Sequence, residues 1–147
     1  LAIAAEKLHR ECNLSVLTVQ ACYVAQELYG PTSGGLTHGG EIETLAILSA
    51  YPELVHLDQV AASSDSSHGS KMDKLRRTRA YQPVLSDIRA IAPTGWYGDP
   101  QKATIEKGKQ MVEDLATSIS VRAEEIFILL EEVNGGLATL DKLRGDV

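Results

Sequence analysis

The segment LSVLTVQACY, residues 14–23, is almost continuously apolar and is rich in leucine, valine and threonine. Such residues favour β-strands, and an unbroken apolar run is typical of a parallel strand that is buried on both faces. The segment therefore predicts a parallel β-strand in the interior of the protein.

The residues before this segment predict an amphipathic helix. Charged side chains lie opposite apolar ones that recur at three- and four-residue intervals, namely Leu1, Ala4, Ala5, Leu8 and Cys12. A helix followed by a buried strand is the second half of a β-α-β unit, whose first strand would precede Leu1. Because the chain starts inside a helix and without methionine, we expect a processed chain, a second chain of a larger protein, or upstream residues that this sequence lacks.

The residues after segment 14–23 predict a loop and then a second helix. Gly30-Pro31 and the glycines that follow mark residues 29–37 as a loop. Residues 41–51 predict a short helix that ends before Pro52 and buries Ile42, Leu45, Ala46 and Leu48. We expect residues 54–61 to form a short strand or a turn-linked extended segment, and the polar residues 62–70 to form a mobile loop.

The clearest helix start lies at Asp99 and Pro100, which fit the N-cap and the first helical position. Apolar residues continue at helical spacing to Val133, and Asn134-Gly135-Gly136 predicts the end of that helix in a left-handed cap. Glycine costs a helix about 1 kcal/mol relative to alanine. Gly108 therefore either allows a close contact with another element or marks a restart of the helix.

Together these elements predict an α/β protein. They comprise one or two strands and three helices, and so few strands cannot form a closed sheet of their own. We therefore expect residues 1–147 to be one half of an α/β domain.

Composition excludes several classes of function. The net charge of −6 argues against binding of nucleic acids or anionic membranes through bulk charge. The chain has no apolar stretch of about 18 residues, so we expect no membrane span. Cys12 and Cys22 belong to no disulfide or metal motif, which favours buried free thiols in a reducing cytoplasm.

A polar cluster lies in the stretch GGLTHGGEIETLAIL, residues 34–48. His38 and Glu41 are three residues apart and can converge at the start of the helix, whereas Glu43 lies about 200° around the helix from Glu41. Histidine and carboxylates bind zinc, manganese or iron, and they also serve as general acids and bases. The alternative is that glutamates in a first turn only stabilise the helix dipole, by about 0.3–1 kcal/mol. The spacing leaves both interpretations open.

Two motifs occur in order along the chain. The first is His38-Gly39-Gly40-Glu41-Ile42-Glu43-Thr44, which is followed by an apolar helix and by Pro52-Glu53-Leu54-Val55. The second is Gly98-Asp99-Pro100-x-x-Ala103-Thr104-x-Glu106-Lys107-Gly108. In this order the motifs resemble the signatures of the creatininase (creatinine amidohydrolase) family. The resemblance covers residues 14–116, essentially the C-terminal half of a family member.

The resemblance implies a three-layer α/β fold, typically assembled as a homohexamer. It also implies hydrolysis of amide-like bonds in a small-molecule substrate, at a site with one or two divalent metals such as zinc, manganese or iron. His38 would contact the substrate and act as general acid–base, and Glu41 would be a metal ligand. Glu43 would anchor the helix, or it would contact the metal ligands and orient them without binding the metal itself. The metal would polarise the carbonyl group and lower the pKa of a bound water.

Other signatures of the family have no counterpart in this chain, namely its Glu-x-His ligands, its metal-binding aspartate and its Asn-Gly-His segment. We therefore expect a separate N-terminal chain of the same enzyme to complete the metal site, in a homo- or hetero-oligomer. The residues Gly34-Gly35-Leu36-Thr37 replace the aromatic and acidic residues of creatininase itself. This difference argues against creatinine and leaves cyclic amides, formamides and cyclic ketones as substrates. The alternatives are a non-catalytic structural subunit of such an assembly and a small acidic binding module.

Overall fold

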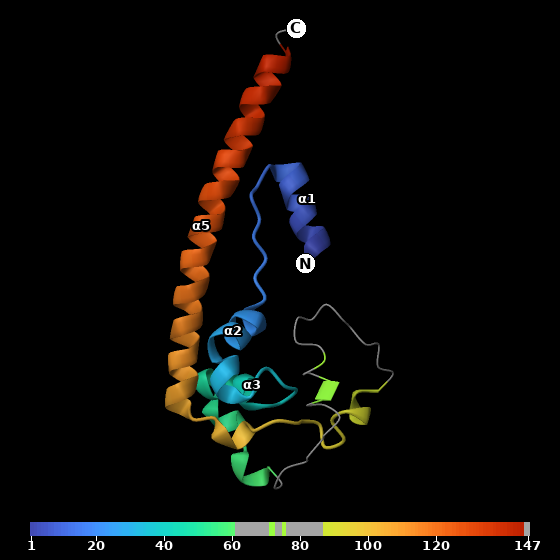
Figure 1. The fold of residues 1–147 in the computed structure, drawn as a ribbon, viewed down its shortest axis with the longest axis vertical. Coiled ribbons are helices and arrows are strands. Elements are labelled where there is room, and N and C mark those ends of the chain that lie inside the picture. The colour runs from blue at the N-terminus through green and yellow to red at the C-terminus, as the bar shows by residue number, and fades with distance from the viewer. Residues whose placement is uncertain (61–70, 73–74, 76–86, 146–147) are drawn as a thin grey trace. The chain divides into compact units, whose positions relative to one another are not determined.

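The computed structural model describes residues 1–60, 71–72, 75 and 87–145 (Figure 1). Within these ranges the chain forms helices and turns, and no β-strand occurs. The predicted three-layer α/β fold is therefore wrong for this chain. Residues 14–20 join α1 (Ala2–Cys12) to α2 (Ala21–Ser33) without regular secondary structure, and residues 21–23 belong to α2. A strand needs a neighbouring strand for its backbone hydrogen bonds, and the described residues supply none.

The chain divides into two compact units. The first contains Leu1–Gln20 and Ala116–Val147, and the second contains Ala21–Leu115. Helix α5 (Ile105–Gly145) contributes its beginning to the second unit and its remainder to the first. The expectation that residues 1–147 are one half of a single domain stays a prediction.

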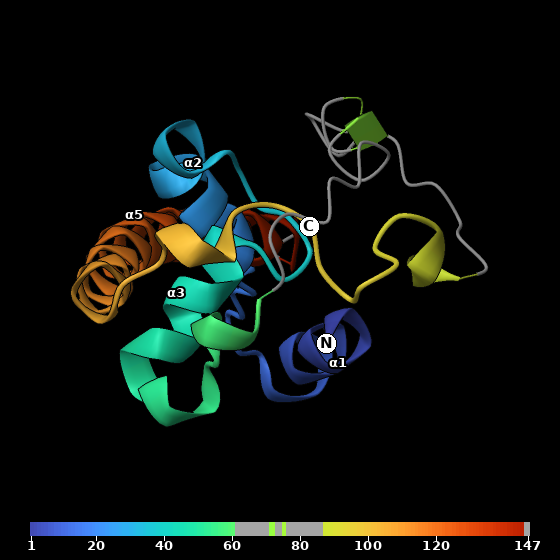
Figure 2. The same ribbon diagram turned by 90° about the horizontal axis from the view of Figure 1, so that it is seen from below.

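The core of the second unit combines α2, α3 (Glu41–Ala50) and the beginning of α5. Helices α2 and α3 lie side by side (Figure 2). The buried side chains of this core are Ala25, Ile42, Leu45, Leu48, Ala103 and Met111. Full burial of a leucine or methionine side chain stabilises a fold by about 1.5–3 kcal/mol. Because the members come from both motif regions, this core holds the two motifs together.

Helix α3 confirms the prediction for residues 41–51. It follows Gly40 and ends at Ala50, directly before the Tyr51-Pro52 step. Its buried residues include Ile42, Leu45 and Leu48 as predicted, whereas Ala46 is exposed. The short turns η1 (Pro52–Leu54) and η2 (Leu57–Gln59) take the place of the short strand expected over residues 54–61, and each is followed by an extended residue, Val55 and Val60. As far as residue 60, the structure thus fits the alternative of a turn-linked extended segment.

Helices α1 and α2 each differ from the prediction in one respect. Helix α1 forms where the apolar spacing predicts it, but none of its residues is buried. Helix α2 continues through Gly30 and Pro31 to Ser33, so the predicted loop over residues 29–37 is wrong in its first half. The packing of Ala25 and Tyr29 in the core outweighs the local preference of a glycine–proline pair for a turn. Residues 62–70, predicted as a mobile loop, lie outside the described residues.

The last helix begins in two steps. The predicted start at Asp99 and Pro100 opens the short turn η4 (Pro100–Lys102), and α5 follows from Ile105. The carboxylate of Asp99 pairs with Lys102 Nζ at 2.7 Å and makes no capping bond to the backbone. Helix α5 continues through residues 134–136 to Gly145, so the predicted cap at these residues is wrong. Two glycines lower helix stability but do not force a helix to end.

At Gly108, α5 lies directly against the backbone of α3. A Cβ atom at this position would lie 2.5 Å from the carbonyl oxygen of Leu45 and 3.2 Å from the backbone nitrogen of Ser49. The first of the two predicted roles of Gly108, a close contact, is therefore confirmed. None of the helices in the described ranges combines the length and the apolar character that crossing a membrane requires.

Candidate functional site

The two sequence motifs meet in the second unit, although more than 50 residues lie between Thr44 and Gly98. The turn of residues 37–40, which we call the His38 turn, leads into α3, and residues 95–98 lead towards η4 and α5. The backbone N–H of Tyr97 donates a hydrogen bond to the carbonyl oxygen of His38, with a donor–acceptor distance of 2.9 Å. This bond ties the His38 turn to the residue directly before the second motif.

Gly39 makes this close contact possible. Its φ angle is +66°, and a Cβ atom here would lie 2.7 Å from the Cβ atom of Trp96. A larger residue would be strained in this backbone conformation and would push the two segments apart. The glycine of the motif therefore serves the approach of two backbones.

The imidazole of His38 is exposed to solvent. Its backbone is held by the bond from Tyr97, so the side chain extends from a turn whose main chain is fixed. An exposed imidazole on a fixed turn can act as a general acid or base towards a bound molecule.

Glu43 binds back onto the His38 turn. Its Oε2 atom accepts a hydrogen bond of 2.7 Å from the backbone N–H of Gly39. With Gly40 as N-cap, Glu43 occupies the third helical position, from which a glutamate reaches back to a free amide at the helix start. Through this hydrogen bond Glu43 anchors the start of α3 to the His38 turn. A contact between Glu43 and metal ligands stays a prediction.

Glu41, the first residue of α3, is the buried carboxylate of the site. Only 1% of its surface is exposed. Its Oε1 atom accepts a hydrogen bond from Nζ of Lys107 in the first turn of α5, and the two groups form an ion pair. Its Oε2 atom is also buried and has no hydrogen-bond partner among the described residues. The side chain of His38 is thus exposed to solvent, whereas the side chain of Glu41 is buried.

These contacts test whether the described residues fit a divalent metal. A protein metal site takes at least three ligands from histidine, cysteine or carboxylate side chains. The described part of the chain contains no group of three such side chains that could hold a metal ion. In addition, the Lys107 ammonium occupies one oxygen of Glu41 and would repel a second cation. The described residues therefore do not fit a metal by themselves.

Comparison with known proteins identifies the family. The sequence model of the family described as "Creatininase: Creatinine amidohydrolase" matches residues 1–122. The chain belongs to the creatininase family. This match confirms the resemblance that the His38 and Gly98 motifs indicate.

One curated relative of this creatininase-family chain is named mycofactocin precursor peptide peptidase and comes from Mycobacterium ulcerans (strain Agy99). The two are 30% identical over 93 residues, which make up 60% of this chain and 34% of the relative. The chain thus spans about a third of that relative's length. No solved structure matches the chain.

Two long-range contacts in the second unit of this creatininase-family chain have no local signal in the sequence. Lys107 was part of the second motif but had no assigned role, and its position three residues after Thr104 offers no local sign of a partner 66 residues away. The hydroxyl of Tyr29 donates a hydrogen bond of 2.5 Å to Asp114 across 85 residues. This bond raises the pKa of Tyr29 to about 12, with smaller contributions from burial and from the negative charge of Asp114. The same bond is the main cause that lowers the pKa of Asp114, and Gln110 adds to the effect.

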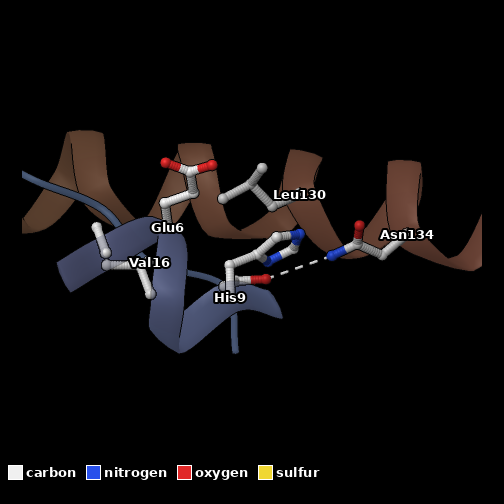
Figure 3. A pocket seen from close by; sticks show the side chains of 7 residues that line it. Glu6, His9, Val16, Leu130 and Asn134 are labelled. Carbon is white, nitrogen blue, oxygen red and sulfur yellow. Dashed lines mark hydrogen bonds between the residues drawn. The ribbon is translucent and has the colours of Figure 1, made fainter. Parts of the chain in front are cut away.

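A separate hollow of about 330 Å³ lies in the first unit (Figure 3). Glu6 and His9 of α1 face Leu130 and Asn134 of α5 across it. The carbonyl oxygen of Leu14 lies 3.0 Å from Nδ1 of His9, and the amide of Asn134 donates a hydrogen bond of 3.3 Å to Ser15 Oγ. Both motifs of the family lie in the second unit, so this hollow is not part of the candidate site.

Proposed function

We propose that this chain is part of a hydrolase that cleaves amide-like C–N bonds, with His38 as the general acid–base. The observation that carries the proposal is the exposed imidazole of His38 on a turn that is held by Tyr97 on one side and by the Glu43–Gly39 bond on the other. A positioned acid–base group contributes typically about 10²–10⁴-fold to a reaction rate.

Membership of the creatininase family supports the class of reaction. The curated relative is named as a peptidase, which supports an amide or peptide bond as the bond that is cleaved. The substrate class is therefore a small amide, a cyclic amide or a short peptide. Gly34-Gly35-Leu36-Thr37 before the motif still argue against creatinine.

The family is generally metal-dependent, and a bound zinc, manganese or iron would supply Lewis-acid activation of a carbonyl group and of water. Because the described residues do not fit a metal, its ligands would come from elsewhere in the assembly. We accordingly propose an N-terminal chain of the same enzyme as partner, in a homo- or hetero-oligomer that could be a hexamer. The exposed apolar side chains of α1, Ile3 and Leu8, support a partner surface on this helix.

A second candidate is a non-catalytic subunit that stabilises a creatininase-like assembly. The pairing of Glu41 with Lys107 favours it, because it accounts for a buried carboxylate without any catalytic role. The two candidates differ in what they predict for His38.

The test is amide hydrolysis by the assembly purified with every chain that accompanies it, with added zinc or manganese. A panel of cyclic amides, formamides and short peptides serves as substrates. His38→Ala should lower turnover by about 10²-fold or more. His56→Ala, which changes another exposed histidine in the second unit, is the matched control. Equal turnover of the His38→Ala variant and the native assembly would favour the structural subunit.

A further inference from the structure

The carboxylate of Glu41 is placed where a charge is costly. Its side chain is 1% exposed, and a buried charge is stable only when a partner of opposite charge and hydrogen bonds compensate for the lost hydration. Lys107 is the cation that does so, through an ion pair with Oε1. The pair therefore compensates the charge of Glu41 at Oε1 without a metal, whereas Oε2 is also buried and has no hydrogen-bond partner among the described residues.

Lys107 is itself held in place by its own helix. Its backbone N–H donates a hydrogen bond of 3.2 Å to Oγ1 of Thr104, at the start of α5. The next residue, Gly108, lies against the backbone of α3 at Leu45. These backbone contacts fix the position in the second motif from which the Lys107 ammonium group reaches Glu41.

The ion pair lies at one end of the His38 turn. The bond from Tyr97 N–H holds the turn at His38, and the pair holds the chain at Glu41, three residues further on. One tie runs to Tyr97, directly before the second motif, and the other to Lys107, within it. A change at either tie would alter the direction of the residues between them, including the His38 side chain.

We propose that Glu41 is the counter-ion of Lys107, and that this buried pair positions the His38 turn against the start of α5. Glu41 then acts as a positioning residue instead of the metal ligand that the resemblance implies. The pair needs no assumption about catalysis, and only the significance of the position of His38 rests on the proposed function.

Because Glu41 is more deeply buried than Lys107, we expect removal of the lysine ammonium to destabilise the chain more than removal of the glutamate charge. Lys107→Met leaves a carboxylate that is 1% exposed without its cation. Glu41→Gln leaves a lysine whose side chain is 34% exposed and can turn to water along its flexible stem. Lys107→Met should therefore be the more harmful change, and adding Glu41→Gln to it should restore part of the loss.

The experiment measures urea unfolding of the full chain and the imidazole NMR resonances of His38. Lys107→Met should raise the ratio of unfolded to folded chains at least about 100-fold, as expected when one partner of a buried pair is removed. Glu41→Gln should raise it about tenfold or less. The double variant should be more stable than Lys107→Met, and Lys107→Arg should keep most of the native stability. Arg122→Met is the matched control, because it breaks an exposed ion pair with Glu125 on the same helix.

The His38 resonances should shift in Lys107→Met and in Glu41→Gln but not in Arg122→Met. A contribution to stability alone would leave them unchanged in the folded variants. If Lys107→Met does not fold, the double variant provides the comparison, and recovery of folding supports the pair. A Lys107→Met chain that is as stable as the native chain would overturn the proposal, as would unshifted His38 resonances or a double variant no more stable than Lys107→Met. No substrate is needed, so these results are independent of the amidase test.

Discussion

At the scale of single residues, Tyr29 and Asp114 show how a distant contact changes the chemistry of two side chains. The bond stabilises the protonated phenol and the ionised carboxylate, because the phenol donates and the carboxylate accepts. It raises the pKa of Tyr29 to about 12 and lowers that of Asp114. Each direction determines the pH range in which the bond contributes to stability.

The first prediction concerns alkaline pH. The pKa of Tyr29 rises from 10.0 to about 12 in the folded chain, so the contribution of the phenol is complete below pH 10.0 and is lost as the pH rises to about 12. Urea midpoints should fall across this interval, and they should fall less in Tyr29→Phe. Tyr51→Phe, at an exposed tyrosine, is the control. Asp114→Asn should return the phenolate absorbance titration of Tyr29 towards 10.0, and an unchanged titration would contradict the hydrogen bond.

The second prediction concerns the start of α3. Glu43→Ala removes the acceptor for the Gly39 amide and should destabilise the chain by about 0.5–2 kcal/mol, the range for loss of a helix cap. Urea unfolding provides the measurement. Glu124→Ala is the control, since Glu124 is exposed in the middle of α5 and should have little effect. Equal unfolding midpoints for the two variants would show that the contact has no stabilising role.

At the scale of elements, the close contact between α5 and α3 depends on Gly108, which has no side chain. Most helices gain stability when alanine replaces an interior glycine, by about 1 kcal/mol. At Gly108 the new methyl group would meet the carbonyl oxygen of Leu45 at 2.5 Å, and backbone atoms cannot move aside as a flexible side chain can. The two effects therefore oppose each other, and the clash is the larger one.

The third prediction follows from this opposition. Gly108→Ala should destabilise the second unit by about 1–3 kcal/mol, the usual cost of overpacking, despite the better helix propensity of alanine. Lys109→Ala, at the next and exposed position, should have little effect. Thermal unfolding of both variants gives the comparison. A gain in midpoint for Gly108→Ala would mean that α3 and α5 are less closely packed than the structure has them.

At the scale of the whole molecule, the chain carries the two motifs of its family but no complete metal group among its described residues. It also spans only 34% of the peptidase-named relative. The proposal of a larger assembly rests on the incomplete set of metal ligands in the described residues, with this chain contributing His38 and the motif core.

The fourth prediction tests that assembly. The chain by itself should retain little zinc or manganese after dialysis, because metal sites require at least three suitable ligands. The assembly, identified by intact masses of all its chains, should retain divalent metal in a fixed ratio to this chain. Metal bound to the isolated chain in a fixed ratio, and lost in His38→Ala, would contradict the proposal by placing the ligands within these 147 residues.

The sequence by itself determined what depends on neighbouring residues. The spacing of apolar side chains predicts α1, and the glycines before Glu41 with Pro52 after Tyr51 set the limits of α3. These signals act within a few residues, where capping and backbone preferences decide the conformation. The two ordered motifs also indicated the family, because residue types and their order can be read from the sequence without the fold.

Only the tertiary structure decided the features that join distant residues. Segment 14–20 has the composition of a strand, but a strand also needs a neighbour, and the described residues contain none. In the same way, Glu41 has the chemistry of a metal ligand, but Lys107, 66 residues away, occupies one of its oxygens. Gly108 was open to two roles until the position of α3 showed what lies next to it. The physical reason is the same in each case: pairing, burial and close packing depend on which atoms the fold brings together, and spacing along the chain does not specify them.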